Sequence, residues 1–209
     1  MLLLSAPNRG PCFLFSVLAC VLASEIRKKK LQEYLLRLSY QDQLTGIRNN
    51  TSYIRMLNQL LEHPVPVGVA FADLNGLKYL NDTYGHEYGD QALRHLAEVS
   101  MEYFAKDQLY RVSGDEFVII CPEVQEEVFI RQAQLLKERL KQEEQGLAAF
   151  GYLWNDGTTA ADRLLHGAER LMYQEKQQHY RDSTRRVQEC PGYAQALYKR
   201  YRQREEKEE

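Results

Sequence analysis

Three acidic residues lie at points where predicted strands end or turn. Asp73 is next to the end of the almost continuously apolar segment 65–74, and Asp115 and Glu116 come directly after a predicted hairpin turn. In α/β proteins, ligand-binding groups lie at the carboxyl ends of buried strands, and Mg²⁺ takes oxygen ligands that it usually shares with substrate phosphates. The acids are therefore candidates for a metal site that also binds phosphate, although single acids at such positions are often ordinary turn or cap residues.

A small-residue turn and a lysine follow the first acid. Lys78 comes five residues after Asp73, behind Asn75 and Gly76. Backbone N–H groups at the start of a helix attract anions, and a lysine adds a mobile positive charge for a phosphate. This segment therefore predicts phosphate binding beside the acids.

A polar series continues the same segment. A carboxylate accepts hydrogen bonds from the N1–H and N2–H₂ groups of guanine, and an amide both donates and accepts. Such side chains can read a purine edge, although a single histidine is more often a structural or surface residue. The series consists of Asn81, Asp82, Gly85, His86, Gly89 and Asp90.

The apolar pattern predicts the elements that position these groups. Helices are expected from the cap-type residues 49–51 to residue 63, from Asp90 to about residue 104, over 125–142 and over 159–180. Strands are expected over 65–74, 109–112, 117–121 and 147–154, the middle two forming a hairpin. This order predicts an α/β fold with a central mixed β-sheet flanked by helices, preceded by an N-terminal apolar helix.

Four motifs stand in order along this part of the chain. They read DQLTGIRNN at residues 42–50, DLNGLKYLNDTYGHEYGDQAL at 73–93, RVSGDEF at 111–117 and LMYQEK at 171–176. Together they resemble the GGDEF domain of diguanylate cyclases, over about residues 42–180. The resemblance implies an enzyme that condenses two GTP into cyclic di-GMP and releases two pyrophosphates. Because each such domain holds one GTP, it also implies a homodimer as the active form.

The resemblance further implies a role for each matching residue. Mg²⁺ or Mn²⁺ would be bound by Asp73, the Leu74 carbonyl, Asp115 and Glu116. Catalysis would rest on Asp115 as proton acceptor, on Glu116, and on Lys78, which would stabilise charge on the phosphates. Substrate contacts would come from Gly76, Leu77, Asn81, His86, Asp90 and Lys176, with Asn81 and Asp90 reading guanine.

The chain departs from the family pattern at several positions. The first glycine of the signature is Ser113, which fits if its φ is negative or mild strain is tolerated. The family's product-inhibition site is an R-x-x-D sequence, and here Phe104 stands at the arginine position while Asp107 keeps the aspartate. A phosphate-contacting arginine is replaced by Tyr180. We therefore expect weak or absent product inhibition at the secondary site.

The N-terminus is apolar but short. Residues 11–24 carry no charge, whereas a membrane-spanning helix needs about 20 apolar residues. A signal peptide, a buried core helix and a membrane anchor all fit this segment. The basic cluster at 27–30 favours the anchor, because such a cluster retains the following domain in the cytoplasm. We predict attachment to the cell membrane with a cytoplasmic catalytic domain, with a wholly cytoplasmic protein as the alternative.

The predicted organisation has four parts. An anchor at 1–24 precedes a linker helix at 25–41, the GGDEF domain at 42–181 and a charged extension at 182–209, in which 191–204 form a helix. The linker carries an apolar stripe of Leu31, Leu35 and Leu38. The stripe fits a helix packed on its own domain and a short coil that joins two copies equally well.

Bulk composition narrows the classes of function. The 209-residue chain has a formal net charge of −2, which gives no reason to expect nucleic-acid binding. The basic residues at 199–204 stand among acids and favour a solvated helix face. Cys12, Cys20, Cys121 and Cys190 form no C-x-x-C pair, which argues against a zinc or disulfide framework.

Two hypotheses of different kinds follow. The first is an active cyclase, and the second is a catalytically silent GGDEF domain that binds GTP or a partner as a regulatory module. Because silent members usually lose the metal-binding acids and this chain keeps them, the active cyclase is favoured.

Overall fold

The computed structural model describes residues 10–143 and 147–186, and the chain divides into two compact units, Met1–Ser39 and Tyr40–Glu209. Helix α1 (Gly10–Tyr40) joins the predicted apolar segment and linker helix without a break, and its leucine stripe is exposed. No helix in the described residues is long and apolar enough to cross a membrane. The anchor predicted over residues 1–24 therefore stays a prediction. Residues 1–9 of that segment lie outside the described part.

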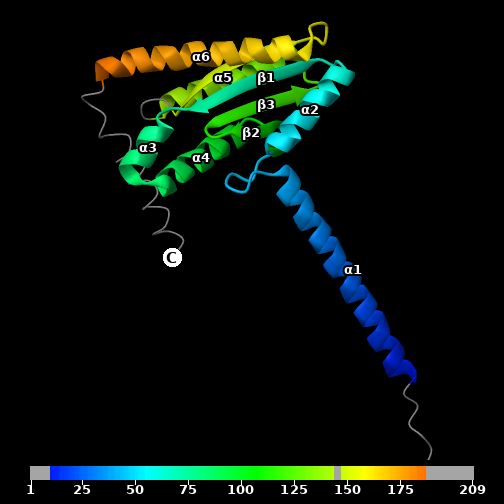
Figure 1. Cartoon of the computed structure of the whole chain (residues 1–209). Helices are drawn as coiled ribbons and strands as arrows, with labels where there is room; N and C mark the ends of the chain where they lie inside the picture. Colours follow the sequence, from blue (N-terminus) through cyan, green and yellow to red (C-terminus); the bar gives the residue numbers. More distant parts are fainter. Residues whose placement is uncertain (1–9, 144–146, 187–209) are drawn as a thin grey trace, which may run out of the picture. The chain divides into compact units, whose positions relative to one another are not determined.

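The second unit is built on a four-stranded sheet with the strand order β2-β3-β1-β4. The strands are β1 (Val67–Leu74), β2 (Leu109–Ser113), β3 (Glu116–Pro122) and β4 (Ala148–Asn155) (Figure 1). All three ladders between them are antiparallel, so β1 and β2 run in the same direction with β3 between them. Among the described residues, the parallel pairing expected in a mixed sheet is limited to an isolated bridge between Arg48 and Tyr110. The reason is the β2–β3 hairpin. It places β3 between β1 and β2, so these two strands run in the same direction but do not pair with each other.

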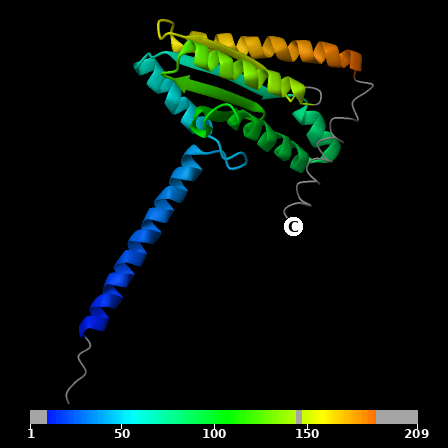
Figure 2. The same ribbon diagram turned by 180° about the vertical axis from the view of Figure 1, so that it is seen from behind.

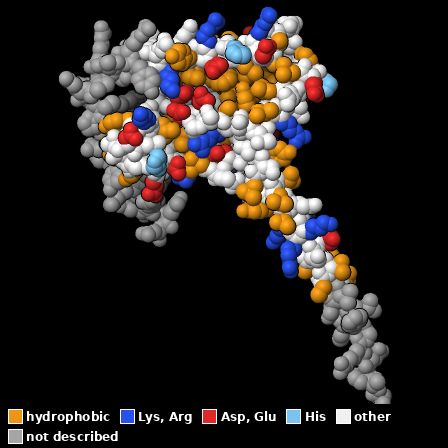
Figure 3. Space-filling view, in the orientation of Figure 1, with side chains coloured by type: hydrophobic (Ala, Val, Ile, Leu, Met, Phe, Trp, Pro, Cys, Tyr) orange, Lys and Arg blue, Asp and Glu red, His pale blue; other side chains and the backbone are white. Residues whose placement is uncertain are grey.

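Helices cover both faces of this sheet, as predicted. One face packs against α4 (His86–Met101) and α5 (Glu126–Gln142), and the other against α2 (Asn50–Glu62) and α6 (Ala161–Arg186) (Figure 2). Successive side chains of β1 point to opposite faces and are buried on both, which explains its continuous apolar sequence. In the space-filling view, hydrophobic side chains gather over the sheet between α6 and α2 (Figure 3).

Local sequence signals explain most element boundaries. The predicted N-cap Asn49 accepts a hydrogen bond from the Ser52 N–H at 3.1 Å and opens α2. The helix predicted from Asp90 is present as α4, but it begins four residues earlier at His86, and a separate short helix, α3 (Leu77–Tyr84), precedes it. Gly85 separates them with a φ of 91°, a conformation that glycine adopts without strain. The predicted C-terminal helix over 191–204 lies outside the described residues.

Candidate functional site

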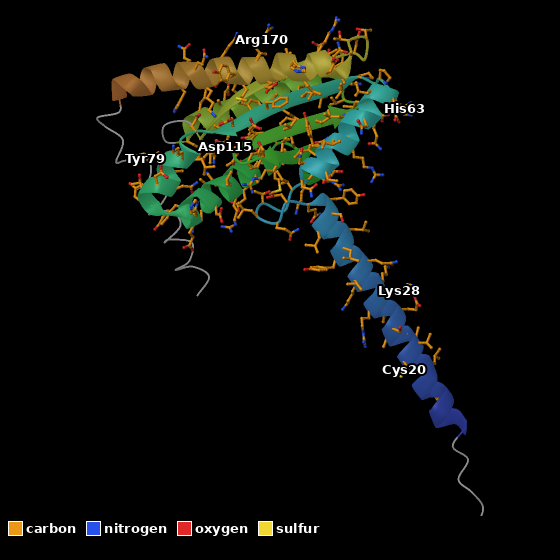
Figure 4. All side chains as sticks on the ribbon, in the orientation of Figure 1. Cys20, Lys28, His63, Tyr79, Asp115 and Arg170 are labelled. Atoms are coloured by element: carbon orange, nitrogen blue, oxygen red, sulfur yellow. The ribbon has the colours of Figure 1, made fainter. Side chains whose placement is uncertain are left out.

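The end of β1 and the β2–β3 hairpin bring three predicted site acids together. Asp73 lies opposite Glu116 in the register of β1 and β3. The N–H of Leu74 donates to the Asp115 carbonyl at 3.1 Å, which ties the hairpin turn to the end of β1. Figure 4 labels Asp115 at the end of the sheet nearest α3, which carries the labelled Tyr79. The three acids therefore share one end of the sheet.

Lys176 reaches the same place from α6. Its Nζ donates to Asp73 Oδ1 at 2.5 Å, and the two side chains are 21% and 6% exposed. Burial raises the pKa of Asp73, the hydrogen bond and charge of Lys176 oppose this rise, and the charges of Asp115 and Glu116 add to it, so that the net direction is upward. Like charges act on one another in this way when they are close. Asp73 is thus a desolvated acid flanked by a cation and two further acids.

The close packing of α6 on β4 sets the position of Lys176. A Cβ on Gly151 of β4 would lie 2.2 Å from the Met172 nitrogen and 2.4 Å from the Ala168 carbonyl oxygen. Glycine therefore allows the helix backbone to lie directly on the strand, one turn before Lys176. This contact carries the lysine to the end of β1.

The hairpin turn accommodates the departure at its first position. Within the described residues, a positive φ outside glycine occurs at Glu123, so Ser113 has an ordinary backbone conformation. Gly114, by contrast, has a φ of 35°. The Ser113 hydroxyl donates to Glu116 Oε2 at 2.6 Å, a contact that the glycine usual at this position cannot make. The serine is therefore unstrained and restrains one of the site acids.

An ion pair that the sequence analysis did not assign holds the same turn. The Nε and Nη2 of Arg111 donate to the Gly114 carbonyl at 3.0 and 2.8 Å, and its Nη1 donates to both carboxylate oxygens of Asp42 at 3.2 and 3.3 Å. Asp42 also accepts from the Thr45 N–H and hydroxyl at 2.9 and 2.7 Å. We call this group the Asp42–Arg111 clamp. It fixes the DQLTG turn to the hairpin that bears Asp115.

The N-terminus of α3 follows β1 after a short turn. Gly76 has a left-handed φ of 72° and its carbonyl accepts from the Leu80 N–H at 3.0 Å. Leu77 opens the helix and Lys78 is exposed on its first turn. The predicted phosphate-binding lysine thus lies on the first turn of the helix that follows β1.

The predicted guanine-reading residues stand on two adjoining helices. Asn81 is on α3 and packs against Gly89 of α4, next to the half-buried Asp90. The Oδ1 of Asn81 is buried and accepts no hydrogen bond from the described residues. A buried acceptor without a donor costs about 1–3 kcal/mol, so a ligand that donates a hydrogen bond to it would remove this cost. The contact at Gly89 therefore places Asn81 beside the residue that precedes Asp90 in the chain.

Two predicted residues make no polar contact with the acids among the described residues. His86 is exposed at the first position of α4, and Lys78 is likewise exposed. Within the described part of the chain, neither forms a hydrogen bond or ion pair with Asp73, Asp115 or Glu116. The predicted roles of His86 and Lys78 therefore require a bound substrate that contacts both these residues and the acids.

The acids fit a metal that substrate phosphates help to bind. Across residues 10–143 and 147–186, no group of three or more His, Cys, Asp or Glu side chains is arranged to hold a metal ion by itself. Mg²⁺, however, commonly binds to proteins through one or two carboxylates together with substrate phosphates and waters. The oxygens of Asp73 and the hairpin acids suit that arrangement, in which the metal would compete with Lys176 for the Asp73 carboxylate.

The position of the missing product-site arginine is closed. Phe104 is 3% exposed and its ring packs on Phe129 with centroids 6.0 Å apart. Phe104 therefore points inward, although it lies beyond the end of α4 at Met101. Asp107 remains exposed at the surface.

A family comparison accounts for this arrangement. Residues 39–182 match the family described as diguanylate cyclase, GGDEF domain. The chain belongs to the GGDEF domain family. The match covers every residue of the site described above, from the clamp to Lys176.

Curated relatives of this GGDEF domain carry several names. The chain is 27% identical to diguanylate cyclase DgcN of Escherichia coli over 167 residues, which are 74% of this chain and 41% of DgcN. It is 33% identical to response regulator PleD of Caulobacter vibrioides over 112 residues, 48% of this chain and 25% of PleD. It is 31% identical to cyclic di-GMP phosphodiesterase PdeR of Escherichia coli over 117 residues, 54% of this chain and 18% of PdeR. The chain thus spans less than half the length of these relatives.

Solved GGDEF structures share the fold. The coiled coil and GGDEF domain of DgcB from Caulobacter crescentus, in complex with c-di-GMP, has a TM-score of 0.64 at 21% identity and covers 78% of this chain and 94% of its own. The GGDEF domain of FimX from Pseudomonas aeruginosa has a TM-score of 0.60 at 22% identity and covers 67% of this chain and 95% of its own.

Proposed function

We propose that this chain is a diguanylate cyclase, which condenses two GTP molecules into cyclic di-GMP and releases two pyrophosphates. The observation that carries the proposal is the meeting of Asp73, Asp115 and Glu116 at one end of the sheet, with Lys176 bound to Asp73. The names of DgcN and the other cyclase relatives support it. Such a site suits phosphoryl-type transfer, which depends mainly on positioning and charge neutralisation.

The chemistry assigns each group a task. In each of two steps, the 3′-hydroxyl oxygen of one GTP bonds to the α-phosphorus of the other, and the bond to the pyrophosphate oxygen breaks. Asp115 takes the hydroxyl proton, and Lys78 and Lys176 neutralise phosphate charge. Asp73, Asp115, Glu116 and the Leu74 carbonyl would hold Mg²⁺ or Mn²⁺, which would supply positive charge for the phosphate oxygens.

The base and the second substrate set further requirements. Asn81 and Asp90 read guanine from adjoining helices, with His86 beside them. Because each domain offers one such set, the two GTP molecules come from two copies of the chain. The exposed leucine stripe of α1 is a surface on which two copies can pair.

The test is direct formation of product. The full chain is incubated with GTP and Mg²⁺, and cyclic di-GMP is sought by mass spectrometry. Asp115→Asn and Glu116→Gln should each abolish product while keeping the thermal transition, whereas Glu138→Gln, an exposed acid of α5, should leave the rate unchanged. Equal product in Asp115→Asn and the parent chain would refute the assignment.

The second candidate is a silent GGDEF domain that binds GTP without turnover. The match to PdeR, which is named as a phosphodiesterase, is the observation that favours it. Equilibrium dialysis with GTP and ATP separates the two candidates. Binding selective for GTP without product supports the silent domain, and GTP turnover supports the cyclase.

A further inference from the structure

We propose that Gly89 is a positioning residue that seats Asn81 for the nucleotide base and thereby sets GTP affinity and base selectivity. The inference rests on the proposed binding of GTP. It concerns a residue without a functional side chain, which acts through its neighbour.

The contact between α3 and α4 is unusually close at this point. A Cβ added to Gly89 would lie 2.0 Å from Asn81 Oδ1 and 2.9 Å from Leu77 Cδ1. Both distances are shorter than the 3.0 Å below which real Cβ contacts essentially do not occur. Any residue other than glycine must therefore displace the Asn81 carboxamide or the face of α3 that carries it.

The backbone does not require glycine at this position. Gly89 lies inside α4 and is absent from the glycines with positive φ. Alanine is a better helix former than glycine in a helix interior. A glycine here is therefore unfavourable for α4 itself, and its benefit lies in the packing of Asn81.

The contact at Gly89 lies between the two helices that carry the residues predicted to bind guanine. Asn81 belongs to α3, and Asp90, the residue after Gly89, belongs to α4. Two groups that hydrogen-bond one base must keep a fixed separation, because a misplaced group forfeits its bond. Widening the α3–α4 contact at Gly89 changes this separation directly.

The experiment compares Gly89→Ala, Asn81→Ala and the double variant in the full chain. Dissociation constants for GTP and ATP are measured by equilibrium titration, with Ca²⁺ in place of Mg²⁺ to prevent turnover. Gly89→Ala should weaken GTP binding by roughly three- to ten-fold, the loss of one neutral hydrogen bond, and leave ATP binding unchanged. The double variant should bind GTP no more weakly than Asn81→Ala, because the Asn81 carboxamide that the added methyl group would displace is already absent.

A matched control separates positioning from general damage. Gly167→Ala also adds a methyl group to a helix glycine, in α6, where the Cβ would lie 2.6 Å from Leu153 Cδ1, the flexible end of a side chain. It should retain GTP affinity. The side-chain amide resonances of Asn81 should shift in Gly89→Ala and not in Gly167→Ala, which is a readout that needs no nucleotide.

The outcomes distinguish this inference from the proposed function. Unchanged GTP affinity in Gly89→Ala, or effects of the two substitutions that simply add, overturns the inference while GTP binding stands. Failure of the parent chain to bind GTP removes the proposed function, and an unmoved Asn81 amide then removes the inference on structural grounds as well.

Discussion

Replacing Arg111 with methionine tests whether the Asp42–Arg111 clamp holds the hairpin. Arg111 joins two segments 69 residues apart in the sequence, through bonds to the Gly114 carbonyl and to the Asp42 carboxylate. Methionine keeps much of the apolar stem but has neither the charge nor the donors. The substitution therefore isolates the polar part of the contact.

The expected loss follows from the number and burial of these bonds. The two side chains are 16% and 22% exposed, so the pair is largely shielded from solvent. A hydrogen bond to a charged group contributes about 1.5–3 kcal/mol, and because the bonds share acceptors we expect about 2–3 kcal/mol for the clamp as a whole. For a domain of this size that lowers the melting temperature by roughly 4–12 °C.

The clamp also has a defined pH dependence. Burial by itself raises the pKa of Asp42, but the hydrogen bonds from Thr45 and the charge and hydrogen bond of Arg111 outweigh it, and the net direction is downward. A group with a lowered folded pKa stabilises the fold fully above its unfolded pKa, about 3.9 for aspartate, and loses this effect as the pH falls through the folded value. The melting difference between the parent chain and Asp42→Asn should thus be constant from about pH 5 to 8 and narrow below about pH 4.

The assay is thermal unfolding of Arg111→Met, Asp42→Asn and the double variant, followed by circular dichroism. The double variant should lose less than the sum of the single losses, because the two residues share one interaction. Arg170→Met, an exposed arginine of α6 (Figure 4), is the control and should stay within about 0.5 kcal/mol of the parent. Additive losses, or an Arg111→Met variant as stable as the control, would refute the reasoning.

Three further predictions concern the site. Ser113→Gly removes the hydrogen bond from the hydroxyl to Glu116 and should destabilise the chain by about 0.5–1.5 kcal/mol. An unchanged melting temperature would show that this hydrogen bond does not stabilise the fold in solution. Specific activity should rise with protein concentration, because each copy supplies one GTP, and a flat profile from a monomer in light scattering would contradict the homodimer. Cyclic di-GMP should inhibit by competing with GTP, because Phe104 lacks the guanidinium that would bind it elsewhere. A non-competitive component that Asp107→Ala abolishes would show that a secondary site survives.

Periodicity and cap residues were sufficient to predict most of the fold. Strand β1 reads as continuous apolar sequence because both its faces are buried, and Asn49 caps α2 as its type predicts. Helix α3 was missed because it has eight residues, too few for a clear helical period, and Leu80 is its one fully buried side chain. The β2–β3 hairpin was predicted, but the antiparallel pairing of β1 with β3 and β4 was not, since strand order depends on how the crossovers and the hairpin interleave.

The site divides along a similar line. Residue types and spacing identified the candidate acids, because a carboxylate after a buried strand is a local signal. The contacts that hold the acids are not local. Arg111 acts through Asp42, a residue 69 positions away, and Gly89 acts by what it lacks opposite a neighbouring helix. Motif residues of this second kind gain a physical role only when the distances between elements are known, and that is why glycines and arginines inside a recognised motif deserve the same mutational tests as its acids.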